Sequence, residues 1–332
     1  MKICYLGTGS WGFCLGHLLA SKGYDVVSWT TNPGLCQQLN QTRIHPRFPK
    51  HPAPKNSSFT TDLAKALDGA DVIVESVTAS GLRPVCEKLL DLKIKPCLFV
   101  LTSKGIEQNS ELILPDVVVD VLGEDFRSFV GSISGPSYAQ EVIQQLPTTV
   151  VASAYDTDTI SKICDLFTTP RFRVYPNQDV IGVAYGGALK NIIAIACGIA
   201  DGLNFGYSTK AAIMTRGLHE MGKLAVAKGC KKETLQGLSG MGDVCLTCSS
   251  SMSRNFRFGQ LLAEGRTAEQ ALQEIGMVVE GAYTCVTALQ ISKELDIPMP
   301  ITETVYQILY EHLNLTEAVA RLMSRTIKEE HL

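Results

Sequence analysis

The sequence predicts a chain of two parts. An α/β domain of the Rossmann type, with a doubly wound parallel sheet, is expected over residues 1–178, and an all-α domain over residues 179–332. Short β-rich runs alternate with helical segments in the first half, a glycine-rich turn follows the first run, and strand signals stop after residue 178. A length of 332 residues also suits two domains, because single cores rarely grow past roughly 250–300 residues.

The first domain alternates strands and helices, which is the pattern of a parallel sheet covered by helices. The expected strands are residues 3–6, 25–29, 72–76, 97–101, 128–132, 148–152 and 173–175. The expected helices are residues 11–21, 62–67, 81–90 and 157–166. Residues 43–55 carry four of the 14 prolines and break this pattern, so we expect an extended loop over one edge of the sheet.

The second domain has helical periodicity and helix-capping signals. Thr267 precedes Gln270 by three residues, which is the spacing of a capping box, and Gly276 can end the same helix. Residues 316–327 have the pattern of an amphipathic helix.

Composition excludes several classes of function. A net charge of −3 argues against nucleic acid or an anionic membrane as a partner. The 11 cysteines have no framework spacing, which is typical of free thiols in a reducing compartment. The Cys245–Cys248 pair has no second pair or histidine cluster beside it, so we expect packing residues and no metal site.

The chain is expected to be a soluble, cytoplasmic protein. A strand-like run begins at Lys2, where a secretory signal would otherwise lie. The longest apolar stretch is interrupted by Lys190 and Asn191, and falls short of the roughly 18 residues that span a bilayer.

Gly7, Gly9 and Gly12 form a G-x-G-x-x-G motif between the first strand and the first helix. In such motifs the first glycine makes a tight turn, the second admits a pyrophosphate, and the third lets helix and strand pack closely. The motif therefore predicts dinucleotide binding. After the second strand the chain reads Trp29-Thr30-Thr31-Asn32, without an acidic residue for the ribose or an arginine for a 2′-phosphate, so NADH and NADPH both stay open.

Lys190 is the one lysine or arginine in a long helical run of valine, alanine, isoleucine and glycine. An unpaired buried cation costs several kcal/mol, so this ammonium group either reaches water or has a function. Gly187, Lys190, Ala194, Cys197 and Asp201 share one helical stripe of small or polar residues, which leaves room for a ligand along the helix. A lysine on an ordinary surface helix is the alternative.

Polar residues also follow two strands of the predicted sheet. Lys104 comes after residues 97–101, and Ser134-Gly135-Pro136-Ser137 comes after residues 128–132. Carboxyl ends of parallel strands face the ligand crevice, so Lys104 is expected where cofactor and substrate meet. A solvated loop lysine and a plain turn are the alternatives.

The helical domain contains a possible anion site. Asp243 precedes a serine-rich stretch that ends in Ser253-Arg254-Asn255. Hydroxyl groups, a guanidinium and an amide together suit a phosphate, because arginine donates in a planar fork. A solvent-exposed serine loop is the alternative.

Taken together, these segments resemble the bacterial type of NAD(P)-dependent glycerol-3-phosphate dehydrogenase over nearly the whole chain. The resemblance is carried by residues 7–12, 103–107, 134–139, 186–191, 198–202, 240–243, 253–255 and 278–281. It implies that Lys190 is the catalytic acid/base that protonates the carbonyl of dihydroxyacetone phosphate, giving sn-glycerol 3-phosphate for phospholipid synthesis. It also implies NAD(P)H as cofactor and a homodimer.

The resemblance assigns further residues to the substrate and the cofactor. The substrate positions are Lys104, Gly135, Ser137, Lys190, Asp243, Ser253, Arg254 and Asn255. Asp243 could orient Lys190 or accept from a substrate hydroxyl. The cofactor positions, beside the three motif glycines, are Ser10, Trp11, Lys104, Ala139, Arg254, Val278 and Glu280. The family often has His-Arg where this chain has Thr31-Asn32, so the preference between NADH and NADPH is undecided.

Two other functions fit parts of the pattern. A reductase of another small hydroxy acid or ketoacid would share the two-domain plan, but it would need a carboxylate clamp in place of Ser253-Arg254-Asn255. A nucleotide-sensing scaffold would bind NAD(H) without needing Lys190, Asp243 and Arg254.

Overall fold

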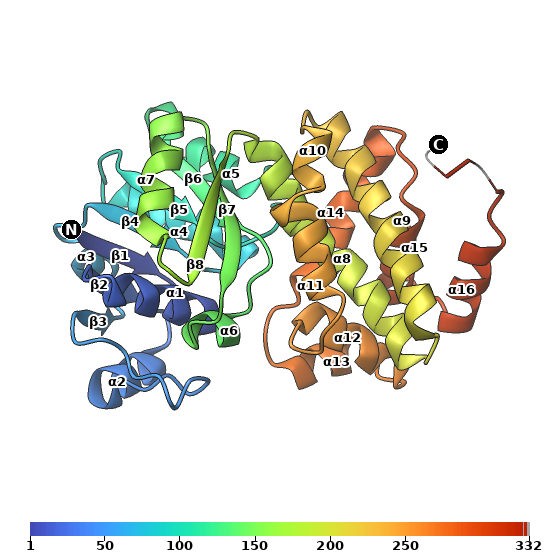
Figure 1. The fold of residues 1–332 in the computed structure, drawn as a ribbon, viewed down its shortest axis with the longest axis horizontal. Helices are drawn as coiled ribbons and strands as arrows, with labels where there is room; N and C mark the ends of the chain where they lie inside the picture. Colours follow the sequence, from blue (N-terminus) through green and yellow to red (C-terminus); the bar gives the residue numbers. More distant parts are fainter. Residues whose placement is uncertain (328, 331–332) are drawn as a thin grey trace. The chain divides into compact units, whose positions relative to one another are not determined.

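The computed structural model describes residues 1–327 and 329–330, and the chain divides into two compact units (Figure 1). The sheet unit consists of Met1–Ser103 and Leu114–Val180. The helical unit consists of Lys104–Ile113 and the chain from Ile181 onward. Residues 104–113 therefore group with the helical unit although they follow a strand of the sheet. The predicted single boundary at residue 178 does not include this feature.

The sheet has eight strands in the described part of the chain, in the order β3-β2-β1-β4-β5-β6-β7-β8. Their bounds are β1 Lys2–Leu6, β2 Asp25–Trp29, β3 Ser57–Thr60, β4 Val72–Glu75, β5 Leu98–Leu101, β6 Val130–Ser134, β7 Thr148–Ala154 and β8 Phe172–Asn177. From β1 the chain builds outward to β2 and β3, and then from β4 in the opposite direction. The carboxyl ends of β1 and β4 thus form a topological switch point, where doubly wound sheets bind their ligands.

The sheet is mostly parallel, as predicted, but it contains one antiparallel pair near one edge. β7 pairs antiparallel with β6, and β8 pairs parallel with β7. The connection from β6 to β7 contains only the five-residue α6, Ala139–Ile143. A helix this short, about 7.5 Å long, does not return the chain to the start of β6, so β7 begins where β6 ends.

Seven helices belong to the sheet unit in the described chain. Besides α6 they are α1 Ser10–Ser21, α2 Pro33–Thr42, α3 Leu63–Leu67, α4 Ala79–Asp91, α5 Leu114–Leu122 and α7 Thr157–Phe167. α1 packs with α6 and α7, and α4 packs with α5. All residues of β4 and β6 are buried, as expected of strands covered on both faces.

Several boundaries differ from the predictions. The strand expected at residues 128–132 lies at Val130–Ser134, because Glu124–Phe129 form a 3-10 helix. β3, α2, α5 and α6 were not predicted. β3 is four residues long, with two serines and a threonine, and gives almost no apolar signal. Residues 43–55 form no helix or strand, which confirms the predicted loop.

The helical unit is built around α8, Val180–Gly202 (Figure 1). The other helices are α9 Gly206–Ala227, α10 Lys232–Leu235, the π-helix η2 Leu238–Gly242, α11 Asp243–Thr247, α12 Arg254–Ala263, α13 Ala268–Ile275, α14 Glu280–Glu294, α15 Pro300–Tyr310 and α16 Leu315–Met323. The capping box at Thr267 and the end at Gly276 are confirmed. α16 ends at Met323, four residues before the predicted end.

α8 is long and apolar enough to cross a membrane, but 83% of its most apolar window is buried inside the structure. Its neighbours approach very closely. A Cβ on Gly198 would lie 2.0 Å from the carbonyl oxygen of Phe256 in α12, and one on Gly281 in α14 would lie 2.6 Å from that of Asn191. α8 is therefore the core helix of this unit.

Candidate active site

The glycine motif of the sheet unit has the tight turn and the close helix packing that the sequence predicts. Gly7 has a φ of +99°, and a Cβ there would lie 2.7 Å from the carbonyl oxygen of Ser76. A Cβ on Gly12 would lie 2.1 Å from the carbonyl oxygen of Gly7, so only glycine lets α1 pack this closely. Gly9 has open space around its missing side chain. That space and the turn fit a pyrophosphate.

The N-terminus of α1 presents backbone donors at this turn. Gly9 is the N-cap residue and supplies no side-chain acceptor, so the first N–H groups of the helix are not capped by that residue. Ser10 and Trp11 are half-buried in the first turn. Free N–H groups and the helix dipole together favour a bound anion.

At the end of β2, Asn32 has a structural role. Its Oδ1 accepts from the N–H of Leu35 at 2.9 Å and so caps α2. Thr31 beside it is exposed. Neither side chain brings a charge to this end of the strand. The preference between NADH and NADPH therefore stays undecided, as it was from the sequence.

Glu75, at the end of β4, was not predicted as a site residue. It is fully buried and accepts hydrogen bonds from the N–H of Val77 and from Ser103 Oγ at 2.6 Å. The carboxylate therefore joins the carboxyl ends of β4 and β5 next to the switch point. In the sequence, a glutamate at the end of the short apolar run Val72–Glu75 was the signal that could have identified this residue.

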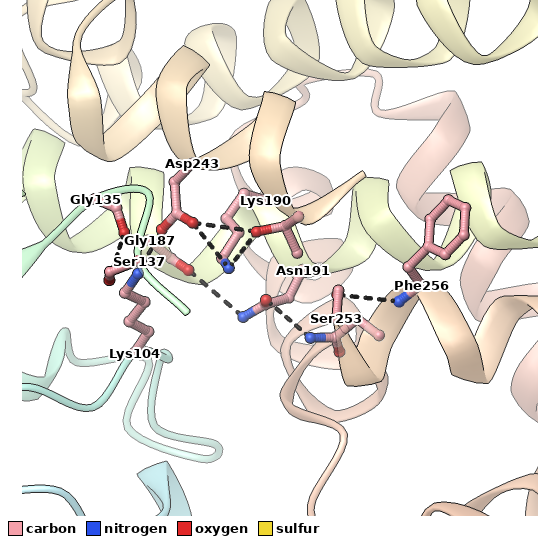
Figure 2. A network of polar contacts seen from close by, with 11 residues as sticks. Lys104, Gly135, Ser137, Gly187, Lys190, Asn191, Asp243, Ser253 and Phe256 are labelled. Carbon is pink, nitrogen blue, oxygen red and sulfur yellow. Dashed lines mark hydrogen bonds and ion pairs between the residues drawn. The ribbon is translucent and has the colours of Figure 1, made fainter. Parts of the chain in front are cut away.

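Lys190 lies at the centre of a polar cluster in the helical unit (Figure 2). Its Nζ donates to Thr247 Oγ1 at 2.7 Å and lies 3.2 Å from Asp243 Oδ1. Thr247 in turn donates to Asp243 Oδ1 at 3.1 Å, and Lys104 Nζ lies 2.5 Å from Asp243 Oδ2. The structure thus brings together three predicted residues, Lys104, Lys190 and Asp243. Lys104 and Asp243 are 139 positions apart in the sequence.

Thr247 is the member of this cluster that the sequence analysis missed. It stands four residues after Asp243 on α11, so both side chains lie on one face of that helix. This spacing was the available signal, but Thr247 lies within the Cys245–Cys248 pattern, whose cysteines are the more conspicuous residues of that segment.

Burial controls the electrostatics of the cluster. Lys190 is 8% exposed and Asp243 is 2% exposed. Burial lowers the pKa of Lys190 to about 8, although Asp243 opposes the shift, and the ammonium group of Lys104 adds to it. Burial alone would raise the pKa of Asp243, but the two ammonium groups together hold it below its ordinary value.

This arrangement suits proton transfer near neutral pH. An ammonium group has three N–H donors, and Thr247 and Asp243 take two of those of Lys190, which leaves one for a ligand. With a pKa of about 8 the group can both give and accept a proton in the physiological range. With both lysines charged and Asp243 ionised, the cluster carries a net positive charge that stabilises a developing alkoxide.

The residues of the predicted anion site, Ser253-Arg254-Asn255, differ in their exposure and in their contacts. Arg254 is exposed as the first residue of α12, and Ser253 Oγ caps that helix by accepting from the N–H of Phe256 at 3.2 Å. Asn255 is buried, donates to Asn191 Oδ1 at 2.9 Å and accepts from the N–H of Gly281 at 2.9 Å. Arg254 therefore faces solvent, whereas Asn255 joins α12 to α8 and α14.

The remaining predicted residues lie at turns and helix starts. In the sheet unit, Gly135 has a φ of +136° after β6, Ser137 donates to its carbonyl oxygen at 3.1 Å, and Ala139 begins α6. In the helical unit, Val278 is half-buried just before α14, and Glu280 is its first residue.

The interpretation of a ligand-facing stripe along α8 is wrong beyond Lys190. Cys197 is fully buried, and Asp201 pairs with Lys210 at 2.5 Å and Gln260 at 2.8 Å. Cys248 of the C-x-x-C pair is also buried. Within the described residues all cysteines are free, and no cluster of potential metal ligands is present.

Comparisons with known proteins agree over both units. The family model for the N-terminal part of NAD-dependent glycerol-3-phosphate dehydrogenase matches residues 2–160, and the model for its C-terminal part matches residues 179–320. The chain is 61% identical over 331 residues to glycerol-3-phosphate dehydrogenase (NAD(P)+) of Protochlamydia amoebophila, covering 100% of this chain and 99% of that protein. It is 55% identical over 334 residues to the enzyme of the same name from Chlamydia abortus, covering 100% and 99%.

Solved structures give the same result. The crystal structure of glycerol-3-phosphate dehydrogenase from Coxiella burnetii superposes with a TM-score of 0.93 at 37% identity, covering 98% of this chain and 99% of that one. The enzyme from Saccharomyces cerevisiae superposes with a TM-score of 0.81 at 24% identity, covering 98% and 99%, which shows the shared fold alone.

Proposed function

The chain belongs to the NAD-dependent glycerol-3-phosphate dehydrogenase family, and on that premise we propose that Lys190 is its catalytic acid/base. As a member of this family it is an oxidoreductase that uses NAD(P). The observation that carries the proposal is the buried ammonium group, whose pKa is lowered to about 8 and which is held by Asp243 and Thr247.

In the direction of reduction, Lys190 donates a proton to the carbonyl oxygen of dihydroxyacetone phosphate as that oxygen becomes an alkoxide. In the direction of oxidation, the neutral amine accepts the proton of the substrate hydroxyl. Asp243 and Thr247 fix the direction of the Nζ lone pair or N–H, and Lys104 adds a second positive charge beside Asp243. NAD(P)H, when bound, supplies the hydride.

The substrate phosphate is proposed to bind at the start of α12. There the guanidinium of Arg254 and the backbone N–H groups of the first helical turn provide donors to an anion. Ser253 caps this turn, and Asn255 holds it against α8. Gly135 and Ser137 are proposed to contribute backbone and hydroxyl donors from the turn after β6.

The cofactor is proposed to bind at the glycine motif of the sheet unit. The open space at Gly9 and the start of α1 at Ser10 and Trp11 suit its pyrophosphate. Lys104, Arg254, Ala139, Val278 and Glu280 are proposed to complete its binding set. The end of β2 favours neither NADH nor NADPH.

The product in the cell is proposed to be sn-glycerol 3-phosphate for phospholipid synthesis, made in the cytoplasm by a homodimer. Tyr207, at the start of α9, has 87% of its surface exposed, and Phe205 just before it has 42%. Exposed aromatic side chains of this kind are enriched at subunit interfaces. Light scattering that gives the mass of one chain would contradict the dimer.

The test compares the wild type with Lys190→Ala, using dihydroxyacetone phosphate and either NADH or NADPH. We expect cofactor oxidation by the wild type and a loss of about 10²–10⁴-fold in kcat for the variant, with cofactor binding retained. Lys223→Ala, on α9, is the control and should keep full activity. Oxidation with a non-phosphorylated ketoacid instead, or cofactor binding without oxidation by any ketone, would overturn the proposal.

A further inference from the structure

The sheet unit has a buried carboxylate in a strand that is otherwise apolar. Glu75 is fully buried at the end of β4, and the other residues of this strand are Val72, Ile73 and Val74. Taking a carboxylate out of water is costly unless hydrogen bonds compensate for its lost hydration. An apolar side chain would avoid this cost in a strand that is covered on both faces. The contacts of the carboxylate therefore indicate what the glutamate contributes.

Each oxygen of this carboxylate holds a different loop. Oε1 accepts from the N–H of Val77, in the loop between β4 and α4. Oε2 accepts from Ser103 Oγ at 2.6 Å, two residues after the end of β5. The N–H of Thr102 also donates to the backbone carbonyl of Glu75 at 2.9 Å. The side chain thus extends the pairing of β4 and β5 into the two loops that follow these strands.

The peptide between Ser76 and Val77 connects the carboxylate to the glycine motif. Its N–H donates to Glu75 Oε1, and its carbonyl group packs against Gly7. A Cβ on Gly7 would lie 2.7 Å from the Ser76 carbonyl oxygen and 3.3 Å from the Val77 nitrogen. This peptide is trans, as are all those in the described chain, so its N–H and its carbonyl point in opposite directions. A hydrogen bond that holds the N–H on Glu75 therefore fixes the direction of the carbonyl that meets Gly7.

The turn at Gly7 is supported from two neighbouring strands. On the β2 side, the N–H of Gly7 donates to the carbonyl of Trp29 at 2.9 Å. On the β4 side, the Ser76 carbonyl packs against Gly7, and Ser76 Oγ shares a hydrogen bond of 2.8 Å with the hydroxyl of Tyr5. The peptide that Glu75 holds is thus the support of the turn on the β4 side.

We propose that Glu75 is a positioning residue for coenzyme binding, which fixes the Ser76–Val77 peptide against Gly7 and so holds the glycine turn in the form that receives the pyrophosphate. This inference rests on the proposed cofactor site at the glycine motif. Glu75 does not touch the coenzyme in this scheme. A turn that is held in place before binding loses less conformational entropy when the coenzyme binds.

A purely structural glutamate would make the same contacts, so the test must separate stability from coenzyme affinity. Glu75→Leu has a similar size and removes both hydrogen bonds of the side chain. Glu75→Gln keeps an oxygen that can accept from Val77 and an amide group that can donate to Ser103 Oγ. Glu220→Leu is the matched control, because Glu220 is also a buried glutamate, and its carboxylate accepts from two backbone N–H groups of α15 in the helical unit, at 2.8 and 3.2 Å.

The readouts are steady-state kinetics with varied coenzyme and coenzyme binding followed by fluorescence, using whichever of NADH and NADPH the wild type oxidises. For Glu75→Leu we expect KM and Kd for the coenzyme to rise about tenfold with kcat within twofold, as the loss of one positioning hydrogen bond predicts. A general loss of stability would instead lower the active fraction, and so kcat, without changing KM. Glu75→Gln should recover most of the affinity, and Glu220→Leu should bind the coenzyme within twofold of the wild type.

Unchanged coenzyme affinity in a folded Glu75→Leu would overturn the inference, and so would an equal loss of affinity in Glu220→Leu. If Glu75→Leu does not fold, Glu75→Met takes its place beside Glu75→Gln, and equal affinity in those two would overturn it. A wild type that neither binds nor oxidises NADH or NADPH would instead refute the proposed function, so the two failures are distinguishable.

Discussion

Asp243 is the residue on which two positive charges depend, one of them buried. Its carboxylate contacts the ammonium groups of both Lys104 and Lys190 and accepts from Thr247. In Asp243→Asn the two ammonium groups would face each other without a counter-charge, and the pKa of Lys190 would fall further. We expect kcat to fall at least about 100-fold.

The control for this variant is Thr247→Val, which removes one neutral hydrogen bond to Lys190 and leaves the charges in place. We expect a loss of about tenfold, in keeping with one hydrogen bond. Thermal unfolding shows whether each variant is folded at the assay temperature. Equal activity of Asp243→Asn and the wild type would mean that Lys190 works without this carboxylate.

The lowered pKa of Lys190 predicts opposite pH profiles for the two directions of the reaction. Reduction needs the protonated amine, so its kcat should fall as the pH rises through about 8. Oxidation needs the neutral amine, so its kcat should rise through the same range. Lys104→Met removes a charge that lowers this pKa, and should move both profiles to higher pH.

These profiles are measured as kcat, in both directions, from pH 6 to 10 for the wild type and Lys104→Met. Using kcat separates proton transfer from any role of Lys104 in binding the substrate. Profiles that move to lower pH in Lys104→Met, or that have the same sign in both directions, would contradict the assignment of this pKa to Lys190.

The sequence predicts single site residues only where one residue departs from its surroundings. Lys190 stands out because it is a lone cation in an apolar helix, and the glycine motif because of its spacing. Thr247 does not stand out. Its role comes from its contact with Lys190, which is distant in the sequence, and no local pattern encodes such a pair.

At the scale of elements, the junction of α8, α12 and α14 supports the site. Asn255 bridges Asn191 to the first turn of α14, and a Cβ on Gly281 would lie 2.6 Å from the Asn191 carbonyl oxygen. Gly281→Ala should therefore push α14 away from α8 and lower the free energy of unfolding by about 1–3 kcal/mol.

The matched control is Gly222→Ala in α9, where nothing lies within 4 Å of the added Cβ. A glycine in a helix is less stable than alanine by about 1 kcal/mol, so this variant should be slightly stabilised. Urea unfolding of both variants and of the wild type provides the comparison. Equal stability of Gly281→Ala and Gly222→Ala would show that the junction adapts without cost.

The elements themselves were predictable where the apolar pattern is strong. The central strands and α1, α4 and α7 were predicted close to their bounds, and the capping box of α13 was found from two residues. The direction of β7 was not predictable, because a local pattern shows that a strand exists and not which way it pairs. β3 was missed because Ser57–Thr60 has too little apolar surface to give a period.

At the scale of the whole molecule, the sequence indicated two parts but not how the chain divides between them. Residues 104–113 leave the sheet unit after β5, and the chain returns to it at Leu114. Lys104 thereby shares a unit with Asp243, from which it is separated by 139 residues. Only the resemblance to a known family, carried by several motifs at once, had grouped these two residues.

The division of the chain into two units predicts that cofactor binding and proton transfer can be lost separately. The glycine motif belongs to the sheet unit, and the Lys190 cluster belongs to the helical unit. Saturating NADH should therefore raise the unfolding temperature equally in the wild type and in Lys190→Ala. At 100 times Kd the stabilisation is about 2.7 kcal/mol, or roughly 5–10 °C.

Gly9→Val tests the proposed cofactor site in the sheet unit, as Lys190→Ala tests the catalytic cluster in the helical unit. Because nothing lies within 4 Å of a Cβ at Gly9, the variant should fold, but its side chain would fill the space that suits the pyrophosphate. It should lose the thermal shift with NADH while its unfolding temperature without ligand stays near that of the wild type. A shift retained in Gly9→Val, or lost in Lys190→Ala, would mean that the coenzyme is not held at the glycine motif independently of the catalytic lysine.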